Sequence, residues 1–116
     1  MAMKIGKITK RANWTTAELQ EVITLYRLFL VAMLAGEKVV KSKHYKALAD
    51  KLDRTTGSVE AKLMNVSGVL KLLARDDSRF SGLIVKGYAL LDSFAIEMID
   101  PVRAQFSGFL QSSKAA

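Results

Sequence analysis

Hydrophobic residues recur every three or four positions along most of this 116-residue chain, a spacing typical of α-helices that bury one face. Thr15 and Glu18 have the spacing of a capping box, in which each side chain accepts a hydrogen bond from the other residue's backbone N–H. Gly36 is a natural end for the helix that follows. We therefore predict a helix over residues 16–35. Its inward-facing positions are Leu19, Val22, Ile23, Tyr26, Leu30, Met33 and Leu34.

Two further helical stripes follow a basic connection at residues 37–43. Ser42 is expected to cap a second helix, and Asp53-Arg54 predicts a tight turn after it. A third helix is expected over about 56–70, with Ser58, Lys62 and Asn65 on the side opposite its apolar stripe. The inward-facing positions of these two helices are Tyr45, Leu48, Ala49 and Leu52, then Val59, Leu63, Val66 and Leu70.

The C-terminal part combines a polar stretch at 74–82, expected to be a loop, with one more apolar stripe. Asp100-Pro101 lies inside that stripe, which predicts two short helices meeting at Asp100 or one helix kinked there. The expected class is all-α, a trihelical core at 14–73 with one or two C-terminal helices at 74–111. Residues 1–13 are expected to form a flexible basic arm and 112–116 a polar tail. The stripe comprises Leu91, Phe94, Ala95, Met98, Val102, Phe106 and Phe109.

The charge of the chain is concentrated in its first half. The whole sequence has 18 Lys and Arg against 11 Asp and Glu, for a net charge of +7. Residues 1–62 hold twelve basic and six acidic side chains, whereas residues 63–116 hold six and five. A basic half beside a nearly neutral half suggests a face that binds a polyanion, most often nucleic acid.

The residue inventory excludes several classes of function. Cysteine is absent and His44 is the single histidine, so thiolate sites and histidine-rich metal centres are not expected. We find no glycine-rich phosphate loop or nucleophile motif, and we expect no enzyme activity and no cofactor. The most apolar run, residues 28–35, is too short to span a membrane, and residues 1–13 do not resemble a secretion signal. These features predict a soluble cytoplasmic protein, associated with the nucleoid if its source is bacterial.

The second and third predicted helices, joined by a short turn, have the arrangement of a helix-turn-helix. In such units the last helix enters the DNA major groove, and its free N-terminal N–H groups favour phosphate. Asn65 is expected to read an adenine edge. The residues expected to contact double-stranded DNA are Arg54, Thr55, Thr56, Ser58, Lys62 and Asn65, with Lys41, Lys43 and Lys46 beside them and Lys10 and Arg11 in the arm.

Two segments carry a resemblance. Trp14-Thr15-x-x-Glu18 followed by Leu48-Ala49-x-x-Leu52-x-Arg54-Thr55 resembles the Myb/SANT-type trihelical helix-turn-helix. The block at 54–66 (RTTGSVEAKLMNV) is similar to the N-terminal module that precedes the nuclease domain of bacterial HNH endonucleases, as are Gly82-Leu83 and Leu91-Asp92. The resemblance implies a DNA-recognition module, used as a regulator or as a specificity module without its nuclease.

A protein-interaction module is the alternative hypothesis, for example a small inhibitor encoded by a phage or mobile element. The apolar run at 28–35 and the C-terminal stripe exceed what a small core requires, and exposed apolar patches usually mark partner surfaces. We expect residues 88–110 to mediate a homodimer. Folding of this segment back onto the first helix is the competing arrangement.

Overall fold

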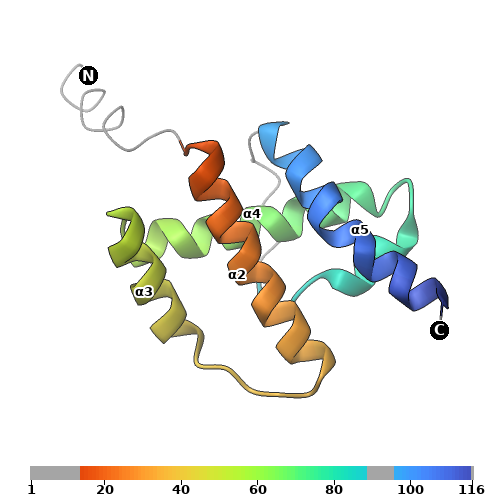
Figure 1. The fold of residues 1–116 in the computed structure, drawn as a ribbon, viewed down its shortest axis with the longest axis horizontal. Coiled ribbons are helices and arrows are strands. Elements are labelled where there is room, and N and C mark those ends of the chain that lie inside the picture. The colour runs from red at the N-terminus through yellow and green to blue at the C-terminus, as the bar shows by residue number, and fades with distance from the viewer. Residues whose placement is uncertain (1–13, 89–95, 116) are drawn as a thin grey trace.

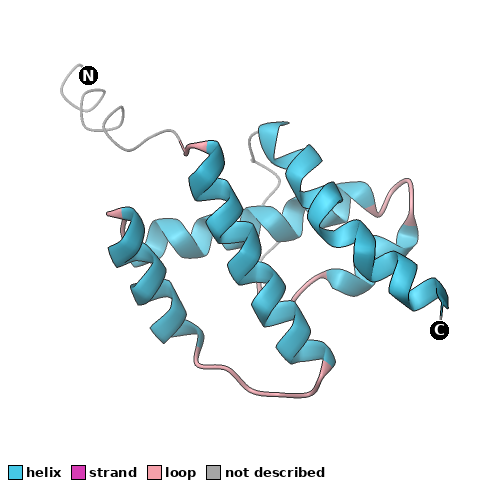
Figure 2. Ribbon diagram, in the orientation of Figure 1, coloured by secondary structure: helices cyan, strands magenta, loops and turns pink. Residues whose placement is uncertain are grey.

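The computed structural model describes residues 14–88 and 96–115 of the chain, with side chains up to residue 110. It confirms the predicted all-α class, because the described ranges contain helices and connecting loops but no strand (Figure 2). The α-helices are α2 (Thr16–Leu34), α3 (Lys41–Leu52), α4 (Thr56–Leu73) and α5 (Ile99–Ala115). Two 3-10 helices, η1 (Ser78–Leu83) and η2 (Ile96–Met98), lie between α4 and α5.

Helix α4 is the centre of the fold and contacts α2, α3, α5 and η1. In Figure 1 it runs across the molecule behind α2, with α3 at the end where α4 begins and α5 towards its other end. This position explains why Leu63, Val66, Val69 and Leu70 of α4 are fully buried. The trihelical part therefore consists of α2 and α3 packed on α4.

The start of α2 is the predicted capping box. The backbone N–H of Glu18 donates to Thr15 Oγ1 over 3.1 Å, and the N–H of Thr15 donates to Glu18 Oε1 over 2.9 Å. The helix ends at Leu34, one residue earlier than predicted, and Gly36 follows with a left-handed φ of 73°. Glycine takes this conformation without a steric penalty, which accounts for the end of the helix here.

Helix α3 begins without the predicted cap. Its first residue is Lys41 and Val40 precedes it with no side-chain cap, so the expectation that Ser42 caps this helix is wrong. Asp53 then adopts a left-handed φ of 55° and ends α3. Thr55 caps α4, whose C-terminal end at Leu73 lies three residues beyond the predicted one.

Several expectations for residues 74–116 need correction. The predicted loop at 74–82 contains η1, which begins where Asp77 accepts a hydrogen bond from the backbone N–H of Arg79 over 3.1 Å. Phe80 and Leu83 of this segment are buried. Pro101 lies in the first turn of α5, which continues directly from η2. The predicted polar tail at 112–116 is helical as far as Ala115.

The apolar stripe of α5 is buried within the same chain. Met98, Val102 and Phe106 have no exposed surface, and the Phe106 ring packs edge-on against Tyr26 of α2 with centroids 5.7 Å apart. The expected dimer contact is therefore occupied by the chain's own core over these residues, and folding back onto α2 is the arrangement observed. Leu91, Phe94 and Ala95 of the predicted stripe lie outside the described residues.

A polar network fixes the junction of α2, α4 and the segment after η1. The buried Tyr26 hydroxyl lies 2.8 Å from Ser67 Oγ and accepts a hydrogen bond from the Val85 N–H, also over 2.8 Å. Burial raises the pKa of Tyr26 above its ordinary value of 10.0. Among the described helices, none is long and apolar enough to cross a membrane.

Candidate nucleic-acid interface

The turn between α3 and α4 is short and compact. Asp53 in its left-handed conformation reverses the chain, and the Arg54 N–H donates to the Ala49 carbonyl over 2.9 Å. Only three residues separate the two helices, so α4 starts immediately beside the end of α3 (Figure 1). The first turn of α4 is consequently held at the surface of the molecule.

The cap of α4 uses two of the predicted DNA-contacting side chains. Thr55 Oγ1 accepts a hydrogen bond from the Ser58 N–H over 3.1 Å, and the Ser58 hydroxyl donates to the Thr55 carbonyl over 3.0 Å. Thr55, Thr56 and Gly57 remain exposed, while Ser58 is half-buried. The exposed turn therefore presents a threonine hydroxyl and backbone N–H groups with little side-chain bulk around them.

Arg54 is an internal structural residue, which corrects the expectation that it points towards DNA. Its guanidinium bonds Glu18 at two points, Nε to Oε2 and Nη2 to Oε1, both at 3.0 Å. The same group lies over the Trp14 ring, 4.0 Å from the centroid. Only 4 % of its side chain and 15 % of that of Glu18 are exposed. We call Trp14, Glu18 and Arg54 the arginine cluster; it joins the start of α2 to the start of α4.

Lys62 lies at the edge of the arginine cluster. Its ammonium is 5.7 Å from the centroid of the Trp14 ring, and the residue is half-buried. Burial, followed by the neighbouring charge of Arg54, lowers the pKa of Lys62 below its ordinary value of 10.5. Lys62 is thus directed towards α2 rather than along the exposed face of α4.

Asn65 is 6 % exposed, so the expectation that it lies on the outer face of α4 is wrong. The neighbouring Val66, Ser67 and Gly68 are also buried, because α5 and η1 pack on the second half of α4. An amide at this depth cannot reach a base edge while the helices keep this packing. The exposed positions of α4 lie in its first two turns and at Lys71 near its end.

The accessible face of α4 has few groups that could read bases. Gly57 and Ala61 are exposed, and Glu60 and Met64 are half-buried. These side chains are small, apolar or acidic, and within the described residues this part of the face has no basic side chain. The surface therefore favours close approach to a backbone more than hydrogen bonding to base edges.

The three predicted lysines of α3 have different surroundings. Lys43 and Lys46 are exposed, and Lys46 lies 3.8 Å from Asp50 in a pair whose side chains are more than 70 % exposed. Such exposed pairs are weak and leave the lysine able to exchange its partner for a phosphate. Lys41 instead donates to the Lys86 carbonyl over 3.3 Å and lies over Tyr88, which removes it from this group. Lys10 and Arg11 lie outside the described residues.

Groups that could hold a metal ion are absent from the part of the chain that the structure describes. His44 packs against the edge of Phe29, with ring centroids 5.5 Å apart. This contact gives His44 a packing role between α2 and α3. Asp77 holds Arg79 through hydrogen bonds of 2.6–3.2 Å at the start of η1.

Comparison with protein-family models, with curated proteins and with solved structures found no match to this chain.

The sequence motif had grouped Trp14, Glu18 and Arg54 without indicating that they touch. The sequence did contain a chemical signal for this contact, because an arginine, an acid and a tryptophan lie at the starts of two helices that a trihelical unit brings together.

Proposed function

We propose that this chain binds double-stranded DNA, chiefly through the sugar-phosphate backbone, with the first turns of α4 as the central contact. The observation that carries the proposal is the exposed start of α4, which follows α3 after a three-residue turn. Exposed N–H groups at a helix start favour phosphate, and Gly57 and Ala61 allow close approach of the duplex. The basic first half of the chain supplies the long-range attraction.

The contacts assigned to DNA are those that the fold leaves accessible. Lys43 and Lys46 contribute phosphate contacts from α3, and Thr56 contributes one from α4. The arm residues Lys10 and Arg11 are proposed to add phosphate contacts. Arg54 and Asn65 have internal structural roles instead. Backbone-directed contacts of this type give affinity with little sequence preference.

Salt-dependent binding tests the proposal. Fluorescence anisotropy with a labelled duplex of random sequence should give a plot of log affinity against log salt with a slope of about −3.6, because each of the four proposed basic contacts contributes about −0.9. The double variant Lys43→Gln/Lys46→Gln should reduce the steepness by about two. The matched control Lys71→Gln/Arg75→Gln removes two exposed charges at the far end of α4 and should leave the slope unchanged.

Equal effects of the two double variants would mean that net charge, and not this surface, controls binding. Absence of binding at low salt would overturn the proposal. In that case the second candidate is a protein-binding module, which exposed apolar residues on α2 favour. Leu28, Val31 and Leu34 are 43 %, 45 % and 59 % exposed, a clustering on one helix that is typical of partner surfaces.

A further inference from the structure

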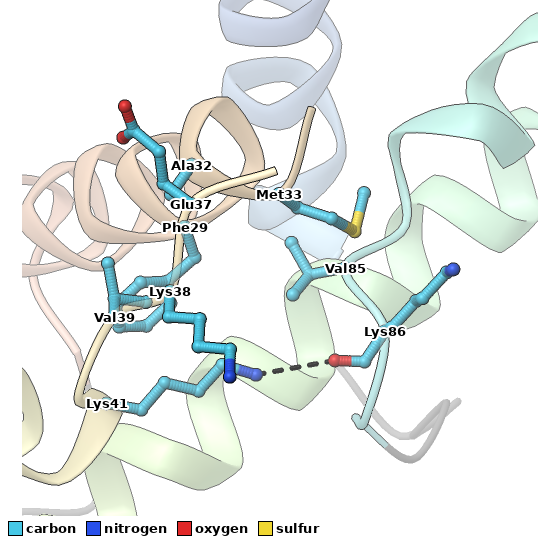
Figure 3. A pocket seen from close by; sticks show the side chains of 9 residues that line it. All are labelled: Phe29, Ala32, Met33, Glu37, Lys38, Val39, Lys41, Val85 and Lys86. Carbon is cyan, nitrogen blue, oxygen red and sulfur yellow. Dashed lines mark hydrogen bonds between the residues drawn. The ribbon is translucent and has the colours of Figure 1, made fainter. Parts of the chain in front are cut away.

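A hollow of about 290 Å³ opens between the C-terminal end of α2, the connection to α3 and the segment after η1. Its lining includes Lys41, the first residue of α3, whereas α4 begins beside the other end of α3 (Figure 1). We call it the lysine hollow. Figure 3 shows its lining, which comprises Phe29, Ala32, Met33, Glu37, Lys38, Val39, Lys41, Val85 and Lys86.

The inner surface of the lysine hollow is apolar. Phe29, Ala32 and Val85 are part of the core, with 1 %, 5 % and 3 % of their surfaces exposed. Met33 and Val39 are half-buried and pack against that core. A ligand that enters would therefore gain free energy by covering the exposed parts of Met33 and Val39, which water now contacts.

The rim of the lysine hollow is cationic. In Figure 3 the Lys38 and Lys41 side chains extend in the same direction, whereas the Glu37 carboxylate points away from them. Lys41 is held in place: it donates to the Lys86 carbonyl over 3.3 Å and lies 4.5 Å from the centroid of the Tyr88 ring. Lys38 is exposed, and no ion pair to it occurs among the described residues.

The phenol of Tyr88 also restricts the position of Lys41. Its hydroxyl lies 2.6 Å from that of Tyr45 on α3, so the ring beneath Lys41 is anchored to the same helix that carries the lysine. The ammonium is therefore preorganised at the edge of the apolar surface. A preorganised cation loses little side-chain entropy when it binds an anion.

We propose that the lysine hollow binds a small organic anion consisting of an apolar ring or short chain and one carboxylate. The apolar body would lie against Met33 and Val39, and the carboxylate would accept hydrogen bonds from the ammonium groups of Lys38 and Lys41. The size of the hollow is near the lower limit of about 300 Å³ for small-molecule sites, which restricts the ligand to one or two rings. This site is separate from the start of α4, which is the central contact proposed for DNA.

Titration with 1-naphthylacetate, followed by amide chemical shifts of the full chain, tests the inference. The uncharged 2-(1-naphthyl)ethanol has a similar shape and serves as the matched ligand control. We expect saturable binding of the acid with shifts concentrated at residues 29–41 and 85–88. The alcohol should bind about tenfold more weakly, because it lacks the charge-assisted hydrogen bonds.

Two variants separate the parts of the site. Lys38→Gln should weaken the acid about tenfold and leave the alcohol unchanged, since it removes a charge and little apolar surface. Met33→Gln should weaken both ligands, because it places an amide in the apolar surface. Lys71→Gln, at the far end of α4, should change neither affinity.

Equal affinities for the acid and the alcohol would overturn the anion assignment. Binding of the acid that is insensitive to Lys38→Gln would overturn it as well. Shifts concentrated outside the hollow, or no saturation at millimolar ligand, would overturn the site itself. Neither result bears on DNA binding, which is measured on another surface.

Discussion

Replacing Arg54 by methionine provides the sharpest test of the arginine cluster. Methionine keeps an unbranched apolar side chain against the Trp14 ring and removes the guanidinium with its two hydrogen bonds to Glu18. The Glu18 carboxylate then stays largely buried, with 15 % exposure, and still accepts a hydrogen bond from the N–H of Thr15. The perturbation is therefore the loss of a paired charge at a nearly buried position.

Removing one partner of a buried ion pair costs about 3–5 kcal/mol, mainly because the remaining charge loses its compensation. Glu18 lies at the edge of the core, retains its capping hydrogen bond and can gain water, so the lower end of this range applies. We expect Arg54→Met to lower the free energy of unfolding by about 3 kcal/mol, or the melting temperature by roughly 12 °C. A domain with about 5–15 kcal/mol of stability remains folded after this loss.

Urea denaturation followed by circular dichroism measures the change. Glu18→Gln preserves the capping geometry, since glutamine also serves in a capping box, and completes a double-mutant cycle with Arg54→Met. The cost of the double variant should be well below the sum of the two single costs. Lys51→Met is the control, because the Lys51–Glu21 pair has the same length of about 3 Å but is 61 % and 39 % exposed, and it should cost under about 1 kcal/mol.

Equal small costs for Arg54→Met and Lys51→Met would refute the structural role of Arg54. Its guanidinium would then be available to DNA, as the sequence motif suggested. The same variant also separates stability from binding. Under conditions where Arg54→Met is fully folded, its DNA affinity should differ from that of the wild type by no more than the removal of one positive charge explains.

Three further predictions follow from the described contacts. Asn65→Ala should lower the free energy of unfolding by about 1–3 kcal/mol in urea denaturation, with no change in DNA sequence preference; a changed preference with intact stability would contradict its burial. Burial raises the pKa of Tyr26, Tyr45 and Tyr88 above 10.0, so at alkaline pH the folded chain keeps phenol protons that the unfolded chain releases. Stability should thus be complete below pH 10 and fall as the pH rises above it, and absorbance at 295 nm should show tyrosinate forming together with the loss of helix. Light scattering should give a monomer mass near 12.8 kDa, because the α5 stripe is already buried; a dimer mass would require another interface.

The helices were predictable because their signals are local. A capping box, a left-handed glycine and a repeating apolar stripe defined α2 to within one residue. The start of α3 was not predictable in this way, because Ser42 has the right chemistry for a cap but the helix begins before it without one. Tertiary packing of the α3 stripe is sufficient to start that helix at Lys41.

The orientation of Asn65 could not be predicted from the α4 stripe alone. A stripe shows which side of a helix must be buried, but it does not exclude burial of the other sides. Here α4 contacts α2, α3, α5 and η1, so it is covered on more than one side. The apolar stripe of α5 was predicted correctly, but the surface it packs on is the chain's own core.

The arginine cluster gives a structural reason for the resemblance to DNA-recognition modules. Trp14, Glu18 and Arg54 belong to the quoted motifs, and all three serve to fix the start of α2 against the start of α4. The motif therefore specifies the geometry of the scaffold and not the contacts with a ligand. Residues that contact DNA through phosphates need only be basic and exposed, as Lys43 and Lys46 are, so their positions carry little sequence signature. The arginine cluster constrains the starts of α2 and α4, whereas the exposed lysines can be replaced with little cost to the fold.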